Sequence, residues 1–443
     1  MSASFLEGQP VCISDIIQLI KRNSHRLRTP KELDPLMEKI SDAKYVLLGE
    51  ASHGTHEYYT WRAKITKRLI LEKNFSFIAV EGDWPDCYRL NRYVKNYPDA
   101  GKSAFDVLHE FNRWPTWMWA NWEIVSLAEW LCEHNKTLPL EKRVGFYGLD
   151  VYSLSESLEA IMKYLEKTDR HAFESATKAI ECFDLYGYEG ESYGRSTHLV
   201  PESCESEVVN LLKEIRSKIT QYNTDHETVF STEQNAWVAV NAENYYRSMI
   251  KDAATSWNIR DKHMAETLNR LTKFHGTKAK AIVWEHNTHI GDARATDMRN
   301  EGMFNLGELV TQEHKKQGVI KVGFGSYKGT VIAGRKWSGE MNKMSMPEGI
   351  EGSWEYILHK TGNDNKLLLM DKCKNDPLFN QYIGHRAIGV VYNPSLERLG
   401  NYVPSILPLR YDAFIFFDET RALHPLHIKP SGHQIPETYP FGV

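Results

Sequence analysis

The stretch "VLLGEASHG", residues 46–54, joins a short apolar run to three polar side chains. The run is continuously apolar, which is typical of a strand that is buried on both faces of a parallel sheet. Glu50, Ser52 and His53 follow directly after it. Such groups are costly to bury without partners. Their position therefore indicates that the strand carries them to a functional site.

Apolar runs of the same kind recur along the chain, and segments with helical periodicity separate several of them. After the first run, Trp61, Ile65 and Leu69 recur every four residues and form one apolar face. Thr55 is the predicted N-cap of this helix, and Asn74 is its predicted C-terminal stop. The alternation predicts an α/β fold with a mostly parallel central sheet flanked by helices. The predicted strands cover residues 45–50, 77–82, 144–150, 281–287, 319–326, 366–371, 387–393 and 413–419.

Only helical patterns occur between the third and fourth predicted strands. Residues 151–278 are therefore expected to form a helical subdomain inserted into an α/β domain made of residues 1–150 and 279–443. Within the insertion, residues 184–203 are rich in Gly, Ser and Tyr, which predicts either a lid over a ligand or a surface loop. The predicted helices cover residues 153–167, 205–222, 232–250 and 260–274.

Length, charge and cysteine content exclude several classes of protein. The 443 residues exceed one ordinary core, and the net charge of -4 without a basic stripe argues against nucleic-acid binding. No run of about 18 apolar residues predicts a membrane span. The N-terminus lacks the pattern of a signal peptide, so we expect a cytoplasmic protein with reduced thiols. The cysteines are scattered without a C-x-x-C pair, at Cys12, Cys87, Cys132, Cys182, Cys204 and Cys373.

Polar side chains also follow the next three predicted strands. Glu81 and Asp83 follow the second, Asp150 ends the third, and His286 and His289 follow the fourth. Ligands of open parallel α/β sheets bind outside the carboxyl ends of the strands. We therefore expect these groups to share one cleft with those of the first strand. For Asp83, capping of the following helix is an alternative role.

The chemistry that such a cleft performs is open at this point. The chain has no G-x-S-x-G elbow that would expose Ser52 as a nucleophile, no H-E-x-x-H pair and no phosphate-binding glycine loop. Histidines with carboxylates can activate water by general base catalysis. The same residue types can also hold a divalent metal ion.

Residues 113–131 concentrate tryptophans at Trp114, Trp117, Trp119, Trp122 and Trp130. A helix that buries an aromatic face in the core is one interpretation. An aromatic wall for a large apolar ligand is the other, because pockets are lined mainly by such side chains.

Six motifs resemble the erythromycin esterase family, and they span about residues 40–427. They are "GEASHGTHEYYTWRAKITKRLI", "FIAVEGDWPDCYRLNRYV", "RWPTWMWAN", "VGFYGLDVYSL", "WEHNTHIGDARATDM" and "DAFIFFDETRALHPL". The first and fifth look more like the uncharacterised bacterial branch, some of whose members are named for succinoglycan biosynthesis, than like the macrolide-resistance enzymes. The resemblance implies a mostly parallel sheet flanked by helices, with the helical subdomain beside the cleft. It also implies a hydrolase of small carboxylic esters or lactones that needs no cofactor.

The resemblance further implies a role for each site residue. His53 would be the general base that activates water, without a metal ion or a covalent nucleophile. The supporting catalytic positions match Glu50, Glu81, His286 and His289. The predicted substrate-binding residues are Arg62, Asp83, Arg294 and Tyr193. Two alternatives remain, namely a metal-dependent hydrolase that uses the same cluster and a non-catalytic binding component of polysaccharide biosynthesis.

Overall fold

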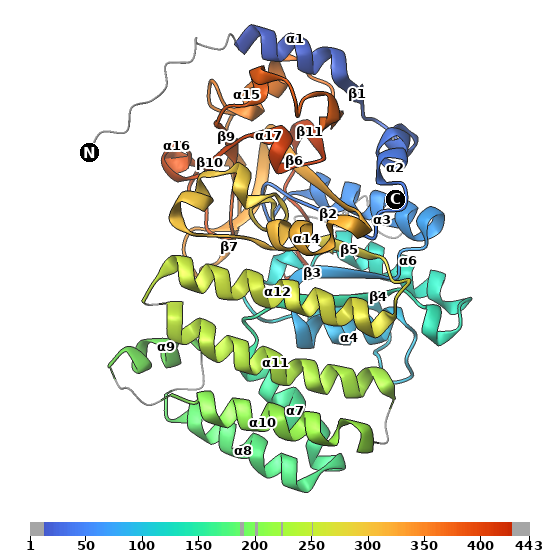
Figure 1. Ribbon diagram of the computed structural model, residues 1–443, viewed down its shortest axis with the longest axis vertical. Coiled ribbons are helices and arrows are strands. Elements are labelled where there is room, and N and C mark those ends of the chain that lie inside the picture. The colour runs from blue at the N-terminus through green and yellow to red at the C-terminus, as the bar shows by residue number, and fades with distance from the viewer. Residues whose placement is uncertain (1–12, 187–189, 200–202, 223–224, 250, 428–443) are drawn as a thin grey trace.

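The computed structural model describes residues 13–186, 190–199, 203–222, 225–249 and 251–427. Cys12 and the first residues of the N-terminus, on which the signal-peptide prediction rests, lie outside this part of the chain. Nine of the described strands form one sheet with helices on both sides, so the predicted α/β fold is confirmed (Figure 1). The strands are β1 (Ser24–Arg26), β2 (Tyr45–Leu48), β3 (Phe77–Asp83), β4 (Gly145–Asp150), β5 (Ala281–Trp284), β6 (Val319–Gly334), β7 (Met341–Met346), β8 (Lys366–Leu369), β9 (Ile383–Arg386), β10 (Tyr402–Ser405) and β11 (Ala413–Thr420).

The helices come between these strands and also form a separate layer. The first six are α1 (Ile13–Asn23), α2 (Asp34–Ile40), α3 (His56–Lys73), α4 (Trp84–Val94), α5 (Ala104–His109) and α6 (Trp122–Lys136). The helices between β4 and β5 are α7 (Leu154–Thr168), α8 (Arg170–Asp184), α9 (Gly190–Leu199), α10 (Glu205–Lys218), α11 (His226–Met249) and α12 (Ala253–His275). The last five are α13 (Asn287–Ile290), α14 (Leu306–His314), α15 (Trp354–Lys360), α16 (Glu397–Gly400) and α17 (Leu407–Arg410).

The centre of the large sheet is parallel, as its apolar strands predict. The strand order is β1-β8-β11-β6-β2-β5-β3-β4, and β7 pairs with the far end of β6. From β11 to β4 every pairing is parallel, whereas β8, β1 and β7 are antiparallel to their neighbours. The carboxyl ends of β2, β5, β3 and β4 consequently lie at one edge of the sheet. This edge carries the site.

Alternate side chains of each central strand enter cores on opposite faces of the sheet. In β2, Val46 and Leu48 pack with α2, α3 and α6, whereas Tyr45 and Leu47 pack with α1, α12, α14 and α15. Helix α3 begins after the predicted N-cap Thr55 and ends before the predicted stop Asn74. The backbone of Asn74 has the left-handed conformation. Both faces of the sheet are therefore covered, which explains why its strands are apolar without alternation.

The residues between β4 and β5 build a helical layer with its own core. Helices α7, α8, α10 and α11 contribute to this core, and α12 lies between α11 and the sheet (Figure 1). Among the helices between β4 and β5, α8 and α9 match none of the predicted helices. Because α12 packs against β4, the helical layer reaches the edge of the sheet that carries the site.

One predicted strand is wrong. Residues 387–393 form only isolated bridges, from Ile388 to Ser52 and from Val391 to Gly334. Two of their apolar side chains are buried nevertheless, because Ile388 and Tyr392 pack on the β6–β7 hairpin in a small separate core. An apolar run therefore marked burial here without marking a strand.

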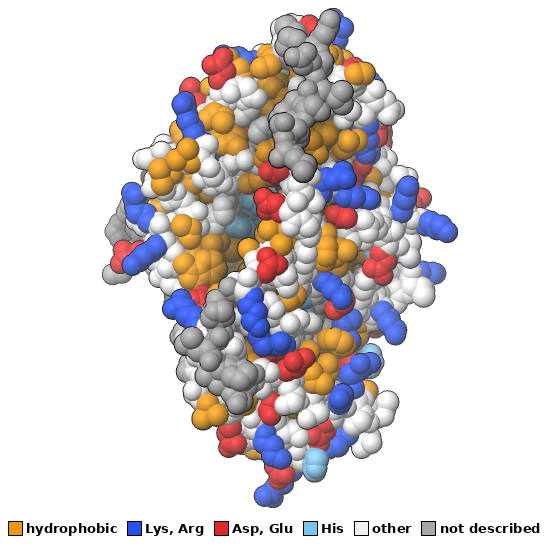
Figure 2. Space-filling model, turned by 60° about the vertical axis from the view of Figure 1, so that its left-hand side comes forward, with side chains coloured by type: hydrophobic (Ala, Val, Ile, Leu, Met, Phe, Trp, Pro, Cys, Tyr) orange, Lys and Arg blue, Asp and Glu red, His pale blue; other side chains and the backbone are white. Residues whose placement is uncertain are grey.

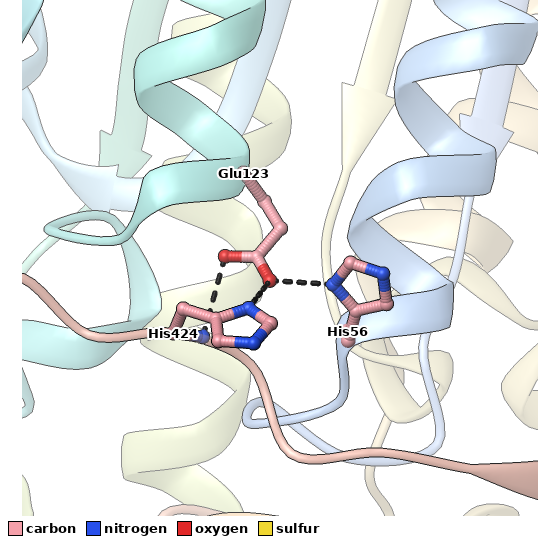
Figure 3. A group of neighbouring side chains, drawn as sticks. All are labelled: His56, Glu123 and His424. Atoms are coloured by element: carbon pink, nitrogen blue, oxygen red, sulfur yellow. Dashed lines mark hydrogen bonds and ion pairs between the residues drawn. The ribbon is translucent and has the colours of Figure 1, made fainter. Parts of the chain in front are cut away.

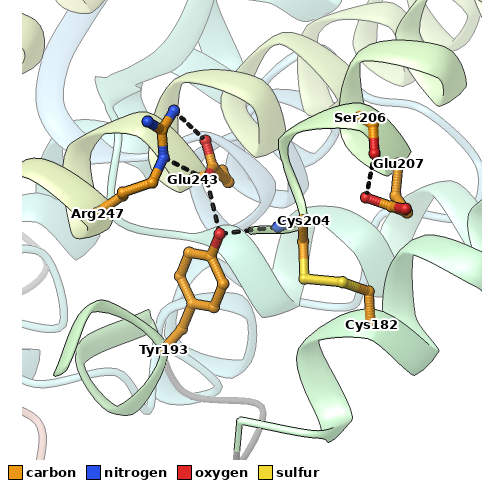
Figure 4. The surroundings of a disulfide bond; sticks show 7 residues. All are labelled: Cys182, Tyr193, Cys204, Ser206, Glu207, Glu243 and Arg247. Carbon is orange, nitrogen blue, oxygen red and sulfur yellow. Dashed lines mark hydrogen bonds and ion pairs between the residues drawn. A yellow bond between two sulfur atoms is a disulfide. The ribbon is translucent and has the colours of Figure 1, made fainter. Parts of the chain in front are cut away.

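The prediction of reduced thiols is wrong for one pair. Cys182 at the end of α8 forms a disulfide bond with Cys204, just before α10 (Figure 4). The two are 22 residues apart, a spacing that matches no local motif. Cys87, Cys132 and Cys373 are buried free cysteines, as predicted.

The prediction of an irregular segment over residues 184–203 is also wrong where the structure describes it. Residues 190–199 form helix α9, which packs on α11. Residues 187–189 and 200–202 lie outside the described part. None of the described helices is both long and apolar enough to cross a membrane.

Candidate active site

A cavity of about 430 Å3 opens at the carboxyl ends of β2, β3, β4 and β5. Figure 2 shows a hollow in this face, with histidine at its floor and hydrophobic side chains around it. Of the predicted catalytic residues, His53, Glu81, His286 and His289 line the cavity, and Glu50 lies directly behind His53. The structure thus brings together side chains from four strand ends.

Close backbone packing shapes the turn that carries Glu50 and His53. A Cβ atom at Gly49 would collide with the amide of Asn287, and one at Gly54 would collide with the backbone carbonyl of Ile332. The backbone N–H of Asn287 donates to the backbone carbonyl oxygen of Glu50 at 2.8 Å. Glycine at both ends of "GEASHG" therefore lets the turn fit between β5 and β6.

His53 is held in one orientation by a buried carboxylate. Its Nδ1–H donates to Glu50 Oε1 at 3.0 Å, and Glu50 Oε2 accepts from Arg62 Nη2 at 2.8 Å. This leaves His53 Nε2 on the cavity side, 4.0 Å from Glu81 Oε1. Burial lowers the pKa of His53, but the charges of Glu81 and Glu50 outweigh it and the net pKa is raised above 6.5.

His286 lines the cavity, and one of its ring nitrogens lacks a hydrogen-bond partner among the described residues. Its Nδ1 accepts from the backbone N–H of Thr288 at 3.3 Å, so the proton of the neutral ring resides on Nε2. That Nε2 is buried and has no hydrogen-bond partner among the described residues. Burial, followed by the charge of His53, holds the pKa of His286 well below 6.5. The ring is therefore a neutral N–H donor, with its centroid 4.8 Å from that of His53.

His289 has both nitrogens occupied. Its Nδ1–H donates to the two oxygens of Asp261 at 3.0 Å each, and its Nε2 accepts from Arg260 Nη1 at 3.0 Å. The ring also stacks on Trp257 with the centroids 4.5 Å apart. His289 consequently positions its neighbours and has no free nitrogen for a substrate.

Arg260 is the hub of the cluster and was not predicted. Its guanidinium donates to Glu81 Oε1 at 2.7 Å and to both oxygens of Asp150 at 2.9 and 2.6 Å, besides His289. Burial raises the pKa of Glu81, but the charges of His289, His53 and Arg260 bring it below its ordinary value. Glu81 is thus an anion that also accepts the backbone N–H of His286 at 2.8 Å.

Arg260 and Asp261 come from α12, in the helical layer. Their only signal in the sequence is an Arg-Asp pair near the start of an amphipathic pattern, which is typical of surface helices as well. Asp150 was noted at a strand end without a role. The helical layer therefore completes the polar floor of the cavity.

The predicted substrate-binding residues fall in different places. Asp83 lines the cavity 3.3 Å from Arg113, and its side chain makes no capping hydrogen bond to α4. Burial raises the pKa of Asp83 to about 7, against the lowering charge of Arg113. Arg62 lies behind Glu50, sandwiched between the rings of Tyr59 and Trp284.

Arg62 does not line the cavity, and the two remaining residues also lie outside it. Arg294 forms an ion pair with Asp292 at 2.7 Å and is 47% exposed. Tyr193 on α9 is buried; its hydroxyl donates to Glu243 at 2.6 Å and accepts the backbone N–H of Cys204 at 2.9 Å (Figure 4). Neither contributes to the cavity lining, and α9 packs on α11 within the helical layer.

Aromatic side chains form the outer wall of the cavity. Trp114 and Trp119 line it, whereas Trp117 is fully buried in the core, so the tryptophan-rich segment serves both predicted purposes. Trp337, on the connection between β6 and β7, is 52% exposed with its ring centroid 4.6 Å from that of Trp114. The further aromatic lining residues are Phe111, Tyr152 and Trp257.

Comparisons with known proteins agree with this architecture. A curated relative, erythromycin esterase type II of Escherichia coli, is 20% identical over 370 residues, which are 78% of this chain and 85% of the relative. A Bacillus cereus protein of known structure superposes with a TM-score of 0.77 at 19% identity, over 94% of this chain and 100% of that one. A succinoglycan biosynthesis protein gives 0.76 at 19% identity, with the same coverage.

An erythromycin esterase mutant crystallised in its open conformation superposes with a TM-score of 0.68 at 15% identity, over 92% of this chain and 99% of that one. These structural likenesses concern the fold. The model of the erythromycin esterase family itself matches residues 70–420, which is most of the chain and includes α12 and three of the four strands whose ends form the site, β3, β4 and β5. The chain therefore belongs to the erythromycin esterase family.

Proposed function

We propose that this protein hydrolyses a carboxylic ester or lactone, with His53 as the general base that activates water. The observation that carries the proposal is the orientation of His53. Its Nδ1–H is fixed on Glu50, and its Nε2 faces the cavity beside the anionic Glu81. A neutral imidazole held this way can take a proton from a water molecule in the cavity. Membership of a family of esterases supports hydrolysis as the reaction class.

In the proposed reaction, His53 Nε2 acts as the base and His286 Nε2–H acts as the hydrogen-bond donor. His53 Nε2 removes a proton from water as its oxygen bonds to the substrate carbonyl carbon. The carbonyl oxygen, on which negative charge develops, accepts a hydrogen bond from His286 Nε2–H. The C–O bond to the leaving alkoxide then breaks, and the imidazolium of His53 returns the proton to it. Glu50 and Glu81 stabilise the imidazolium in between.

Ser52 is poorly placed to be a nucleophile. Its side chain is buried, its hydroxyl is hydrogen-bonded to that of Thr55, and it does not line the cavity. This supports direct attack by water. The aromatic outer wall supports a substrate with an apolar body, such as an aryl ester or a lactone of moderate size.

A metal-dependent mechanism through the same side chains has a steric and electrostatic obstacle. The guanidinium of Arg260 already donates to Glu81 and His289, two of the groups that would ligate an ion, and to Asp150 beside them. A fixed cation thus occupies the centre of the cluster. We expect turnover to survive treatment with a chelator.

The test is a screen of aryl esters and of lactones, macrolactones included, in which acid release is followed with a pH indicator. The proposal expects turnover by the wild-type protein that survives chelation. Absence of turnover together with tight binding of one of the ligands would favour a binding component instead.

A further inference from the structure

A second group of histidine and carboxylate side chains lies outside the cavity. His56 begins α3, Glu123 lies in the first turn of α6, and His424 follows β11 (Figure 3). Glu123 Oε1 is 2.6 Å from His56 Nδ1 and 2.8 Å from His424 Nδ1. One ligand atom from each residue lies within 4.8 Å of the others. We call these three residues the His–Glu–His triad.

Main-chain hydrogen bonds hold the three members of the triad in place. The N–H of His56 donates to the carbonyl of Arg421 at 2.8 Å, and the N–H of Trp122 donates to the carbonyl of His424 at 3.0 Å. The segment after β11 is thereby bonded to the starts of both helices. These backbone hydrogen bonds hold the three segments together independently of the hydrogen bonds between the triad side chains.

The carboxylate of the triad is a buried anion without a fixed cation. Glu123 is 3% exposed, and its ion pairs among the described residues are with His56 and His424 alone. Buried charges are usually paired or bound to metal ions.

We propose that His56, Glu123 and His424 bind a divalent metal ion of the zinc class, which fastens the segment after β11 to α3 and α6. Two imidazole nitrogens and one carboxylate oxygen are a donor set that Zn2+ accepts, with water in the fourth position. Mg2+ and Ca2+ prefer oxygen donors throughout. His424 is 39% exposed, so water and the ion have access from its side.

The required rearrangement is small. Ligands bonded to Zn2+ at about 2.0–2.1 Å in a tetrahedron lie about 3.3 Å apart. The two Nδ1–Oε1 distances of 2.6 and 2.8 Å would therefore open by roughly half an ångström each. Each imidazole binds the ion through Nδ1 and keeps its proton on Nε2.

The test is a Zn2+ titration of the full chain, purified without a histidine tag and stripped with a chelator, by isothermal calorimetry. We expect one equivalent with a Kd below about 10 μM, and a higher Tm with Zn2+ than without it. Glu123→Gln and His424→Asn should each weaken binding at least about tenfold. His427→Asn is the matched control on the same segment, and it should keep the equivalent.

His53→Asn distinguishes this site from the cleft, because His53 Nε2 is the nitrogen that faces the cavity, and it should also keep the equivalent. Absence of stoichiometric binding to folded wild-type protein would overturn the proposal, as would binding that persists in both triad variants or is lost with His53→Asn. If the triad variants do not fold, zinc-edge X-ray absorption of the His53→Asn protein decides. Scattering from two imidazoles in that variant supports the triad, and its absence contradicts it. None of these outcomes depends on the proposed esterase activity.

Discussion

The two histidine–carboxylate clusters flank the same turn, yet they differ in where their positive charge comes from. In the cleft, Glu50 pairs with Arg62 and Glu81 pairs with Arg260. In the triad, Glu123 has only histidines as ion-pair partners among the described residues. The same residue types are thus neutralised by fixed cations in one place and by imidazoles in the other.

The imidazoles of both clusters use Nδ1 for a carboxylate, so the two clusters differ in the cation and not in the nitrogen that is engaged. In the cleft, arginines neutralise the carboxylates, and His53 uses Nδ1 for its carboxylate and keeps Nε2 for a substrate. In the triad, both imidazoles point Nδ1 at one carboxylate oxygen. Carboxylates that are neutralised by arginines suit a site for proton transfer. A carboxylate without an arginine or lysine partner suits a site that binds a metal ion.

Removal of the free nitrogen of the cleft should give the largest effect. We expect His53→Ala to lower kcat by about two to four orders of magnitude, the usual contribution of a general base. Ser52→Ala, one residue away, is the matched control and should lose much less. The measurement is steady-state hydrolysis of the best ester or lactone from the screen. A His53→Ala variant within tenfold of wild type would break the comparison.

Removal of the built-in cation should come next, as a loss of stability. Arg260→Gln leaves the buried carboxylates of Glu81 and Asp150 without their partner, which we expect to lower the free energy of unfolding by about 3 kcal/mol. Arg294→Gln breaks a half-exposed ion pair and should cost less than about 0.5 kcal/mol. Urea unfolding followed by circular dichroism measures both. Equal losses would mean that Arg260 is no more important than a surface arginine.

The pH dependence of the reaction reports the charges around His53. The base works only when it is neutral, and its pKa is raised above 6.5. The value of kcat/KM should therefore fall as the pH is lowered through that raised pKa. Glu50→Gln removes one of the charges that raise it and should move the acid limb of the profile to lower pH. An unmoved or opposite limb would show that Glu50 does not govern the ionisation of the base.

The smallest expected effect concerns the outer wall. Trp337→Ala removes the partner of Trp114 at the mouth of the cavity and should raise KM by about threefold to tenfold with little change in kcat. Leu185→Ala alters an exposed apolar side chain on the helical layer, away from the cavity lining, and serves as the control. If both variants behave like wild type, the substrate does not reach Trp337.

The sheet and its active edge could be predicted because their signals are local. The apolar strands, the cap at Thr55, the stop at Asn74 and the polar residues at the strand ends are all encoded within a few neighbouring residues. A buried strand that ends in a charged residue is recognisable in the sequence as an apolar run followed directly by a charged side chain. The roles of the site residues stay predictions until activity is measured.

The parts that the sequence did not reveal depend on contacts between distant segments. Arg260 reaches Glu81 only because α12 docks on the sheet, and they are 179 residues apart. The bond between Cys182 and Cys204 and the meeting of Glu123 with His424 arise in the same way. Residues 387–393 show the reverse error, because Ile388 and Tyr392 are buried without a sheet ladder.

The central claim is that water, activated by His53, attacks the substrate without a covalent intermediate. The most direct test is intact-mass spectrometry of the wild-type protein, acid-quenched during turnover of a slow aryl ester. We predict only the unmodified mass, at all times and substrate concentrations. An enzyme heavier by the acyl group, with the adduct mapped to Ser52, would contradict the account.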